Sequence, residues 1–397
     1  MAVNLIRNSR VFFTTNVDSS GRVKAGTYKD GTSPFSTTNC WELQVLEGLT
    51  FSQNTTVDTV TLNEAGATPQ RGQRSFNTAL QPLDFSFSTY IRPYNTGSVI
   101  TAEERVLWNA FGSAAAIGAG TAAWTEASSA ATLSFTNSNK HQLQTFGMII
   151  IFDNTAYALD NCALDTATID FGIDAIGTIA WAGKGAAIRP LLNLAADTSS
   201  PVSFTGTDVS GTTPDPVDQA YAKNTTAKYI TNKLSTLVLN DTINDFTNSV
   251  TPSTTYTIAL TGGQIVFNNN LTYLTPANLA QVNLPITYFT GTRAITGNIT
   301  AYLKTGSNDS AQLLSDLLTA SSYTVDPKFT INVQMGGPTS NATGVEVKLP
   351  AAMLQIPQIN TAQVISTTIN FTAQGYTGTS YDITQQNEAS LVYRAGV

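Results

Sequence analysis

The chain has 397 residues, of which 42% are hydrophobic and 12% charged, with a formal net charge of −7. Its length allows two domains with real cores, but its charged fraction is about half of the roughly 25% usual for a soluble domain. Low charge suits a protein whose surface is mostly interface. The negative bias is spread over both halves, which excludes a basic surface that grips phosphates.

In chain order, the first blocks of sequence return later in the same order. IRNSRVFFTTNVD at 6–18 resembles ITNKLSTLVLNDT at 230–242, and ELQVLEGLTFSQN at 42–54 resembles TIALTGGQIVFNN at 257–269. The stretch that begins at Arg74 resembles the one that begins at Arg293, and 168–183 resembles 364–375. A fixed block order with weak identity predicts a duplicated domain rather than a short-period repeat. We expect domains at 1–197 and 223–397, joined by a Pro/Gly/Ser/Thr-rich linker at 198–222.

Strict alternation of apolar and polar residues dominates both predicted domains. LDFSFSTYI at 83–91 has every second residue apolar, and GNITAYL at 297–303 repeats the pattern with Tyr302 in the position of Tyr90. The stretches 168–174 and 365–372 alternate in the same way. A period of two with one polar face predicts an antiparallel sheet that packs on one side only. We also expect one more strand within 381–393.

Each predicted domain has one short helix. TAEERVLWNAFG at 101–112 begins with Thr101 as N-cap and Glu104 three residues later, which is a capping box. SNDSAQLLSDLLTA at 307–320 has Ser307 or Asn308 as its candidate cap. The apolar stripe expected for the second helix is Ala311, Leu314, Leu317 and Leu318. We expect a loop or a loosely ordered excursion for the Ala/Gly/Ser-rich run at 112–131, which has no counterpart in the second domain.

Catalytic and metal-binding patterns are missing from the sequence. The one histidine, His141, lies in a polar run without a nucleophile motif. Cys40 and Cys162 are expected to be buried thiols rather than a zinc site or a disulfide. Asp170 and Asp174 could form an acid pair on one strand face, but the second domain has Asn370 and neutral neighbours there. The sequence therefore argues against an enzyme, a cofactor or a metal.

Several of these blocks together resemble the tail tube proteins of tailed bacteriophages. The resemblance is carried by GQIVFNNNLTYLTPANL, FTGTRAITGNITAYL, the short Leu-rich helix and VKLPAAMLQIPQINTAQVISTTINFTAQG in the second domain. LEGLTFSQNTTVDTVTLNEAG, RGQRSFNTALQPLDFSFSTYIRP and CALDTATIDFGIDAIGTIAWAGKG are a second version in the first domain. Together they cover most of the chain, apart from the linker and the Ala-rich run.

The resemblance implies a mainly β fold: two tandem antiparallel β-sandwich or half-barrel domains, each with one short helix. Copies would associate so that their inner strands complete an inter-subunit β-barrel, and stacked rings would form a hollow tube. An open sheet has two exposed edges, which ring closure satisfies, and a many-stranded barrel leaves an aqueous channel. Double-stranded DNA would pass without tight binding, so we expect a negative or neutral lining.

The resemblance also implies partners and a location. The partners are the chain itself, a tape measure protein, a tail terminator, tail tip or baseplate proteins, and in some tails a contractile sheath, with no membrane. The location is the virion tail, assembled in the bacterial host cytoplasm. Many family members have one domain and form six-membered rings. Two domains favour a trimeric ring with pseudo-sixfold symmetry, and a hexamer with one domain outside the tube is the alternative.

The polar strand faces are the candidate channel wall, although some of them could instead face ordinary solvent. These candidate lumen-facing residues are Asp84, Ser86, Ser88, Asp170, Asp174, Asn298, Thr300, Ser366, Thr368 and Asn370. Arg74 and Arg293 are candidates either for ion pairs between subunits or for structural bridges within a domain.

Two rival classes remain open from the sequence. Another virion component, such as a sheath, decoration or fibre protein, could have a similar composition. A secreted adhesin or other binding module is disfavoured because MAVNLIRNSRVFF lacks the long apolar core that we expect of a signal peptide. A binding module would also be expected to show an aromatic platform, and none is evident.

Overall fold

The computed structural model describes residues 9–23, 26–27, 39–60, 72–135, 141–152, 155–172, 175–192, 202–203, 228–232, 235–240, 255–277, 282–320, 328–337, 342–361, 364–378 and 381–396. This part of the chain is mainly β, with one large antiparallel sheet and two short helices, α1 (Arg105–Gly112) and α3 (Ser310–Ala320). None of its helices is long and apolar enough to cross a membrane.

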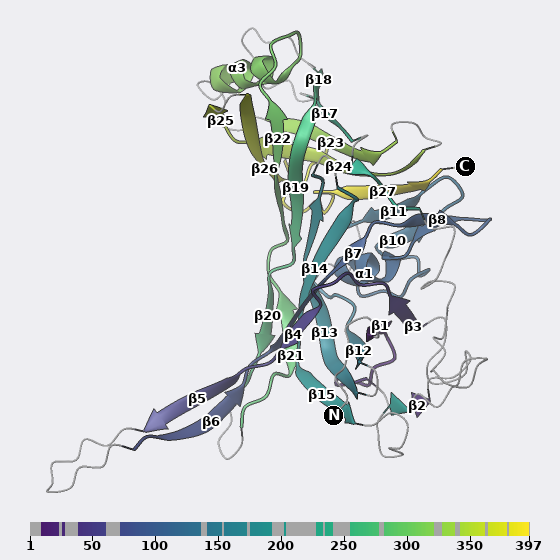
Figure 1. Cartoon of the computed structure of the whole chain (residues 1–397), viewed down its shortest axis with the longest axis vertical. Coiled ribbons are helices and arrows are strands. Elements are labelled where there is room, and N and C mark those ends of the chain that lie inside the picture. Colours follow the sequence, from purple (N-terminus) through teal and green to yellow (C-terminus); the bar gives the residue numbers. More distant parts are fainter. Residues whose placement is uncertain are drawn as a thin grey trace, which may run out of the picture.

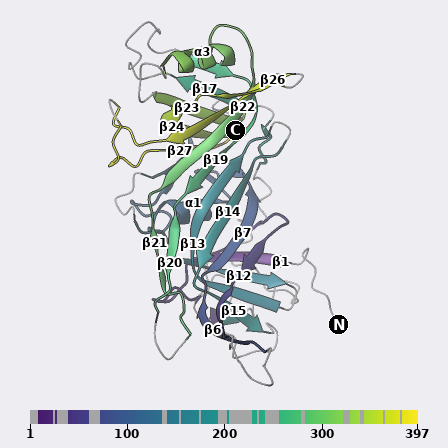
Figure 2. The same ribbon diagram turned by 90° about the vertical axis from the view of Figure 1, so that its left-hand side faces the viewer.

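A run of eight antiparallel strands crosses the middle of the molecule (Figures 1 and 2). In spatial order they are β4 (Thr50–Ser52), β7 (Leu83–Tyr90), β14 (Thr178–Gly185), β13 (Thr155–Asp170), β19 (Leu260–Asn268), β22 (Ala294–Tyr302), β26 (Ile365–Ala373) and β25 (Gln358–Thr361). We call this run the central sheet. The pairing of β13 with β19 makes one surface out of strands from both halves of the sequence.

Further strands lie on the apolar side of the central sheet, where the core is. Next to its lower part lie β3 (Cys40–Leu43), β1 (Ser9–Thr14), β12 (Phe146–Phe152) and β15 (Ala187–Leu192). Near its upper part lie β18 (Thr255–Ile258), β17 (Thr236–Asn240), β23 (Lys328–Gly336), β24 (Thr343–Leu354), β27 (Ser390–Ala395), β11 (Ala131–Ser134) and β10 (Trp124–Glu126). One large apolar cluster joins residues of both halves, from Phe85 and Trp108 to Ile331 and Tyr393.

Four two-stranded units complete the described part of the fold. They are β5 (Thr55–Val60) with β6 (Arg74–Leu80), β20 (Leu271–Leu274) with β21 (Thr287–Thr290), β8 (Pro93–Asn95) with β9 (Ile100–Ala102), and the parallel pair β2 (Gly26–Thr27) with β16 (Val202–Ser203). The β5–β6 ribbon projects far from the body (Figure 1). A backbone hydrogen bond of 2.8 Å from Leu80 N to Asn283 O ties its base to the β20–β21 unit.

The strand predictions are confirmed where alternation is strict. Leu83, Phe85 and Phe87 are buried, while Asp84 on the same strand is exposed. The last predicted strand is also present, as β27. In the first domain the alternation was predicted to run past residue 170, but β13 ends at Asp170. The linker at 198–222 lies outside the described residues except for β16.

The helix boundaries were predicted less well. Thr101 is not an N-cap: it belongs to β9 and its hydroxyl donates to the Glu126 carboxylate, and α1 follows Glu104. In α3 the buried leucines are Leu313 and Leu317, whereas Leu318 is exposed. The Ala-rich run is not only a loop, because it contributes Trp124 and the rest of β10. Trp124 is buried against Tyr393, with a ring centroid distance of 5.1 Å.

Candidate functional site

The side of the central sheet that faces away from the apolar core is a continuous polar surface, which we call the polar face. Residues that stand opposite one another in an antiparallel pair have their side chains on the same side of the sheet. Asp170 is opposite both Thr178 and Gln264, and Thr178 is opposite Tyr90. Gln264 in turn is opposite Asn298, which is opposite Asn370. These registers carry one face from β7 to β26 without a break.

Nine of the ten predicted lumen-facing residues share this face, namely Asp84, Ser86, Ser88, Asp170, Asn298, Thr300, Ser366, Thr368 and Asn370. All are exposed or half-buried in the chain. The tenth, Asp174, lies outside the described residues. Four strands of the sheet, β4, β14, β19 and β25, were not represented among the predicted lumen-facing residues. On β14 and β19, alanines and Val266 on this side weaken the polar alternation, so only the pairing reveals these two strands.

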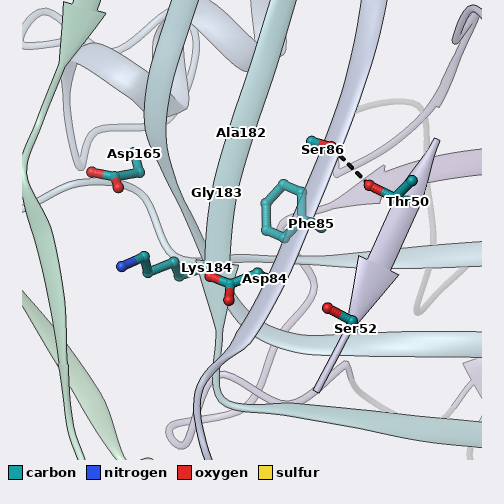
Figure 3. Close-up of a pocket in the computed structure, with 9 residues that line it drawn as sticks. All are labelled: Thr50, Ser52, Asp84, Phe85, Ser86, Asp165, Ala182, Gly183 and Lys184. Carbon is teal, nitrogen blue, oxygen red and sulfur yellow. Dashed lines mark hydrogen bonds between the residues drawn. The ribbon is translucent and has the colours of Figure 1, made fainter. Parts of the chain in front are cut away.

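The described polar face carries little charge. Small hydroxyl and amide side chains dominate it. Asp170 lies at the end near Tyr90, and the other charged side chains gather near the opposite end. There Asp84 stands opposite Lys184, and Asp165 lies nearby (Figure 3). These three residues border a shallow, open hollow of about 220 Å³, where Thr50 and Ser86 share a 2.8 Å hydrogen bond between their hydroxyls. One ammonium among carboxylates does not make a phosphate-binding surface, because such surfaces need clustered cations.

The opposite side of the same strands supports the polar face by close packing. Phe85, Phe87, Trp181, Ile265 and Phe371 are almost fully buried. Trp181 donates its indole N–H to the Thr89 hydroxyl at 2.9 Å, so its buried donor is satisfied. The polar face is therefore one side of a rigid sheet rather than a set of loops.

The two ends of the central sheet are open among the described strands. β4 pairs with β7 on one side, and β25 pairs with β26 on one side. Unpaired strand edges present rows of N–H and C=O groups that can pair with another chain. The exposed apolar side chains Ile356 and Ile359 lie at the β25 end.

The two predicted arginines have different environments. Arg293 forms a 2.6 Å ion pair with Glu388, and its guanidinium lies 4.2 Å from the ring centroid of Phe135. It is therefore a bridge within the chain, between residues far apart in the sequence. Arg74 begins β6 on the exposed ribbon, where its guanidinium stacks 4.8 Å from the centroid of Phe76.

The other residues singled out in the sequence have no visible role in chemistry. Cys40 and Cys162 are free, buried thiols, and burial raises the pKa of both. His141 is exposed, and its backbone carbonyl accepts a 3.1 Å hydrogen bond from the Thr290 hydroxyl. Over the described ranges, no group of three or more His, Cys, Asp or Glu side chains is placed to hold a metal ion.

A rigid open sheet with one polar face and two open edges is the architecture of a structural β protein that associates through its edges. No protein-family model matches the chain. The chain is 31% identical over 409 aligned residues to the tail tube protein pb6 of Escherichia phage T5, with 99% of the chain and 79% of that relative covered. The chain therefore belongs to the tail tube proteins. It is a structural protein of the virion tail that polymerises into the tail tube, not an enzyme.

Proposed function

We propose that the polar face is the inner wall of the tail tube and that three copies of the chain close one ring. The observation that carries this proposal is the unbroken polar register from Tyr90 to Asn370, which crosses both halves of the sequence. A tube wall needs such a surface because water and DNA fill one side while the core lies on the other. The edges of β4 and β25, which are open among the described strands, are then the places where neighbouring copies pair.

A duplication of the tube domain is supported by matching strand orders in the two halves. In the first half β3, β1, β12 and β13 pair in that order, and in the second half β18, β17, β23 and β24 do the same. On the polar side, β4, β7 and β14 correspond to β19, β22 and β26. A helix follows β7 and another follows β22. We accordingly keep the boundaries 1–197, 198–222 and 223–397 as our proposal for the domains.

The internal seam suggests how one copy meets the next. In this correspondence β19 is the counterpart of β4, and β19 pairs with β13 from Thr166–Asn268 to Asp170–Gln264. The counterpart of the end of β13 is β25. If the seam between copies repeats the internal one, β25 of one copy pairs with β4 of the next. The ring then closes through heterologous contacts with every strand edge satisfied.

Barrel geometry favours three copies over six. Eight strands per copy, about 4.8 Å apart and tilted by about 40°, give a diameter of about 50 Å for three copies and about 100 Å for six. The diameter of the smaller barrel already exceeds that of a DNA duplex. A hexamer would need one half of the chain outside the wall, but strands of both halves share the polar face.

The low charge of the polar face suits DNA that must pass without being held. Asp84, Asp165 and Asp170 repel phosphates, and Lys184 is close to compensating acids. A lining rich in lysine or arginine would release counterions from DNA and bind it.

We propose that the exposed β5–β6 ribbon, with Val57, Val60 and Phe76, contacts a neighbouring ring.

The other partners are also proposals, and they rest on family resemblance. A tape measure protein would occupy the channel during assembly, and terminator and tip or baseplate proteins would cap the two tube ends. A contractile sheath would contact the outer surface of the tube. The described residues on that surface do not indicate such a contact.

The test is electron cryomicroscopy of tubes formed by the purified protein, combined with native mass spectrometry of rings released from them. Three chains per ring, with β25 beside β4 of the next copy and the polar face inward, is the expected result. Six chains per ring, or Asn298 and Asn370 on the outer surface, would overturn the proposal.

A further inference from the structure

A short segment ahead of β17, residues 228–232, holds one end of the first half of the central sheet. Gly177 N donates to Ile230 O at 2.8 Å, and Asn232 N donates to Ala175 O at 3.0 Å. These two bonds flank the antiparallel bridge between Ile176 and Thr231. We call residues 228–232 the clasp.

Side chains strengthen the clasp. Ile230 is 1% exposed, and the Asn232 side chain donates to Gly172 O at 3.1 Å. The ring of Tyr229 meets that of Tyr90 edge-on at 5.2 Å, and the Arg92 guanidinium lies 4.8 Å from the Tyr229 centroid. The clasp thus covers the end of β7 and the beginning of β14.

The second half has the same kind of end, and among the described residues no segment pairs with it as the clasp does. Ile91 N donates to Gly177 O at 2.9 Å in the first half, and Leu303 N donates to Ile365 O at 2.9 Å in the second. Tyr90 is opposite Thr178, just as Tyr302 is opposite Ser366. These matches make Ile365 the counterpart of Gly177, and Val364 that of Ile176.

Apolar side chains are exposed on both faces of the sheet at this second end, because Tyr302 shares the face of Ser366 and the neighbouring Ile365 points to the other face. Tyr302 is 55% exposed, Val364 60% and Ile365 43%. The amide of Ile365 points to the same side of its strand as its carbonyl, as every strand residue's does. It therefore occupies the position from which Gly177 donates to the clasp. We call Tyr302, Val364 and Ile365 the vacant end.

The sequence supplies a candidate occupant ahead of β1. β1 is the counterpart of β17 in strand order, and both face their half's core, with Phe13 and Leu237 buried in the same cluster. In the alignment of 6–18 with 230–242, Ile6 matches Ile230 and Asn8 matches Asn232. Residues 5–8 directly precede β1, whereas three residues separate the clasp from β17.

We propose that residues 5–8 of one copy clasp the vacant end of the neighbouring copy. Leu5 then lies on Tyr302, Ile6 O accepts from Ile365 N, and Arg7 stands opposite Val364. The contact is between copies, because β1 and the β22–β26 end lie at opposite parts of the molecule (Figure 1). The proposal rests on the ring of the proposed function and adds a second lock beside the β25–β4 seam.

The internal bridge also supplies the geometry for a direct test. Because the hydrogen bonds from Gly177 N to Ile230 O and from Asn232 N to Ala175 O flank Ile176 and Thr231, these two residues form a non-hydrogen-bonded pair, in which the side chains come closest. Such pairs are near the Cβ separation that a disulfide requires. The equivalent pair across copies is Arg7 and Val364. Cys40 and Cys162 are fully buried and should not interfere.

The experiment assembles the Arg7→Cys/Val364→Cys variant into tubes under reducing conditions and then oxidises the tubes with diamide. We expect the monomer band on a non-reducing gel to shift to covalent dimers and trimers. Ile176→Cys/Thr231→Cys is the matched positive control and should crosslink within one chain. Arg7→Cys/Ile383→Cys is the negative control, since Ile383 is 99% exposed.

The outcomes separate the two proposals. Tubes that form but keep single-chain bands, while the positive control crosslinks, would overturn the clasp and leave the tube wall standing. A wild-type protein that forms no tubes would remove the proposed ring and the clasp with it. As a second measurement, a chain lacking residues 1–8 should lose polymerisation at the concentration at which the wild type forms tubes. Unchanged polymerisation of that chain would contradict the proposal.

Discussion

The indole N–H of Trp108 donates to the hydroxyl of Tyr393 at 2.6 Å, which joins α1 of the first half to the last strand of the chain. Both side chains are fully buried, and they are 285 residues apart in sequence. Trp108 also packs edge-on against Trp181, at 4.7 Å between centroids. The C-terminal strand is therefore part of the support beneath the polar face, not a separate tail.

The Tyr393→Phe substitution tests this link. It removes the acceptor of the Trp108 N–H and leaves that donor buried and unpaired, which costs about 1–3 kcal/mol of unfolding free energy. Urea denaturation of the unassembled protein would measure the loss. Tyr302→Phe is the matched control, because Tyr302 is exposed and should change little. Equal stability of the two variants would show that the buried hydrogen bond contributes nothing.

Glu104 gives a pH dependence of defined sign. Burial, the largest cause, raises the pKa of this carboxyl from 4.5 to about 7, against the opposing effects of nearby hydrogen bonds and Arg92. Below pH 4.5 both the folded and unfolded states are protonated, so there is no penalty. Between pH 4.5 and about 7 only the folded state holds the proton, and the unfolding free energy falls as pH rises. The full penalty of about 3 kcal/mol applies above about pH 7.

The Glu104→Gln variant should therefore gain stability relative to the wild type at pH 8 but not at pH 4. Urea midpoints of the two proteins at both pH values would measure this double difference. Glu47→Gln is the control, because Glu47 is exposed. A wild-type-minus-variant difference that stays the same at both pH values would contradict a raised pKa.

The sequence predicted those parts of the fold that depend on local periodicity. Alternation in 83–91 and 297–303 assigns Asp84 and Asn298 to a polar face without any knowledge of strand partners. The pairing of Thr166 with Asn268 could not be predicted from local periodicity, because it forms only when residues of both halves pack into one core. Lys184 was missed for a different, local reason: the alanines that share its face of β14 hide the polar period.

The failed helix cap has a similar cause. Thr101 followed by Glu104 matches a capping box, but the local pattern cannot show that β8 offers Thr101 a strand partner. Hairpin pairing with Tyr94 takes Thr101 into β9, and its hydroxyl donates to the Glu126 carboxylate instead. The helix then starts after Glu104, whose carbonyl accepts from Leu107 N at 3.0 Å.

Gly297 in the middle of β22 tests how closely the central sheet is packed. A Cβ added there would overlap the carbonyl oxygen of Gln264 and the ring of Phe371. Gly297→Ala should therefore cost about 1–3 kcal/mol of unfolding free energy, as other overpacked sites do. Gly120→Ala is the control, since nothing lies within 4 Å of a Cβ at that position. Equal urea midpoints for the two variants would contradict the prediction, because they would mean that the strands around Gly297 accommodate a methyl group without loss of unfolding free energy.

Introducing positive charge on the polar face tests the channel wall directly. Ser88→Lys combined with Asn370→Lys places ammonium groups on two separated strands without entering the core, so tubes should still form. Because clustered cations bind phosphates, these tubes should retain a fluorescent DNA duplex that wild-type tubes let pass. Raising the ionic strength should release the duplex. Ser88→Gln with Asn370→Gln matches the added length without charge. Retention by both double variants, or by neither, would place these side chains away from the channel.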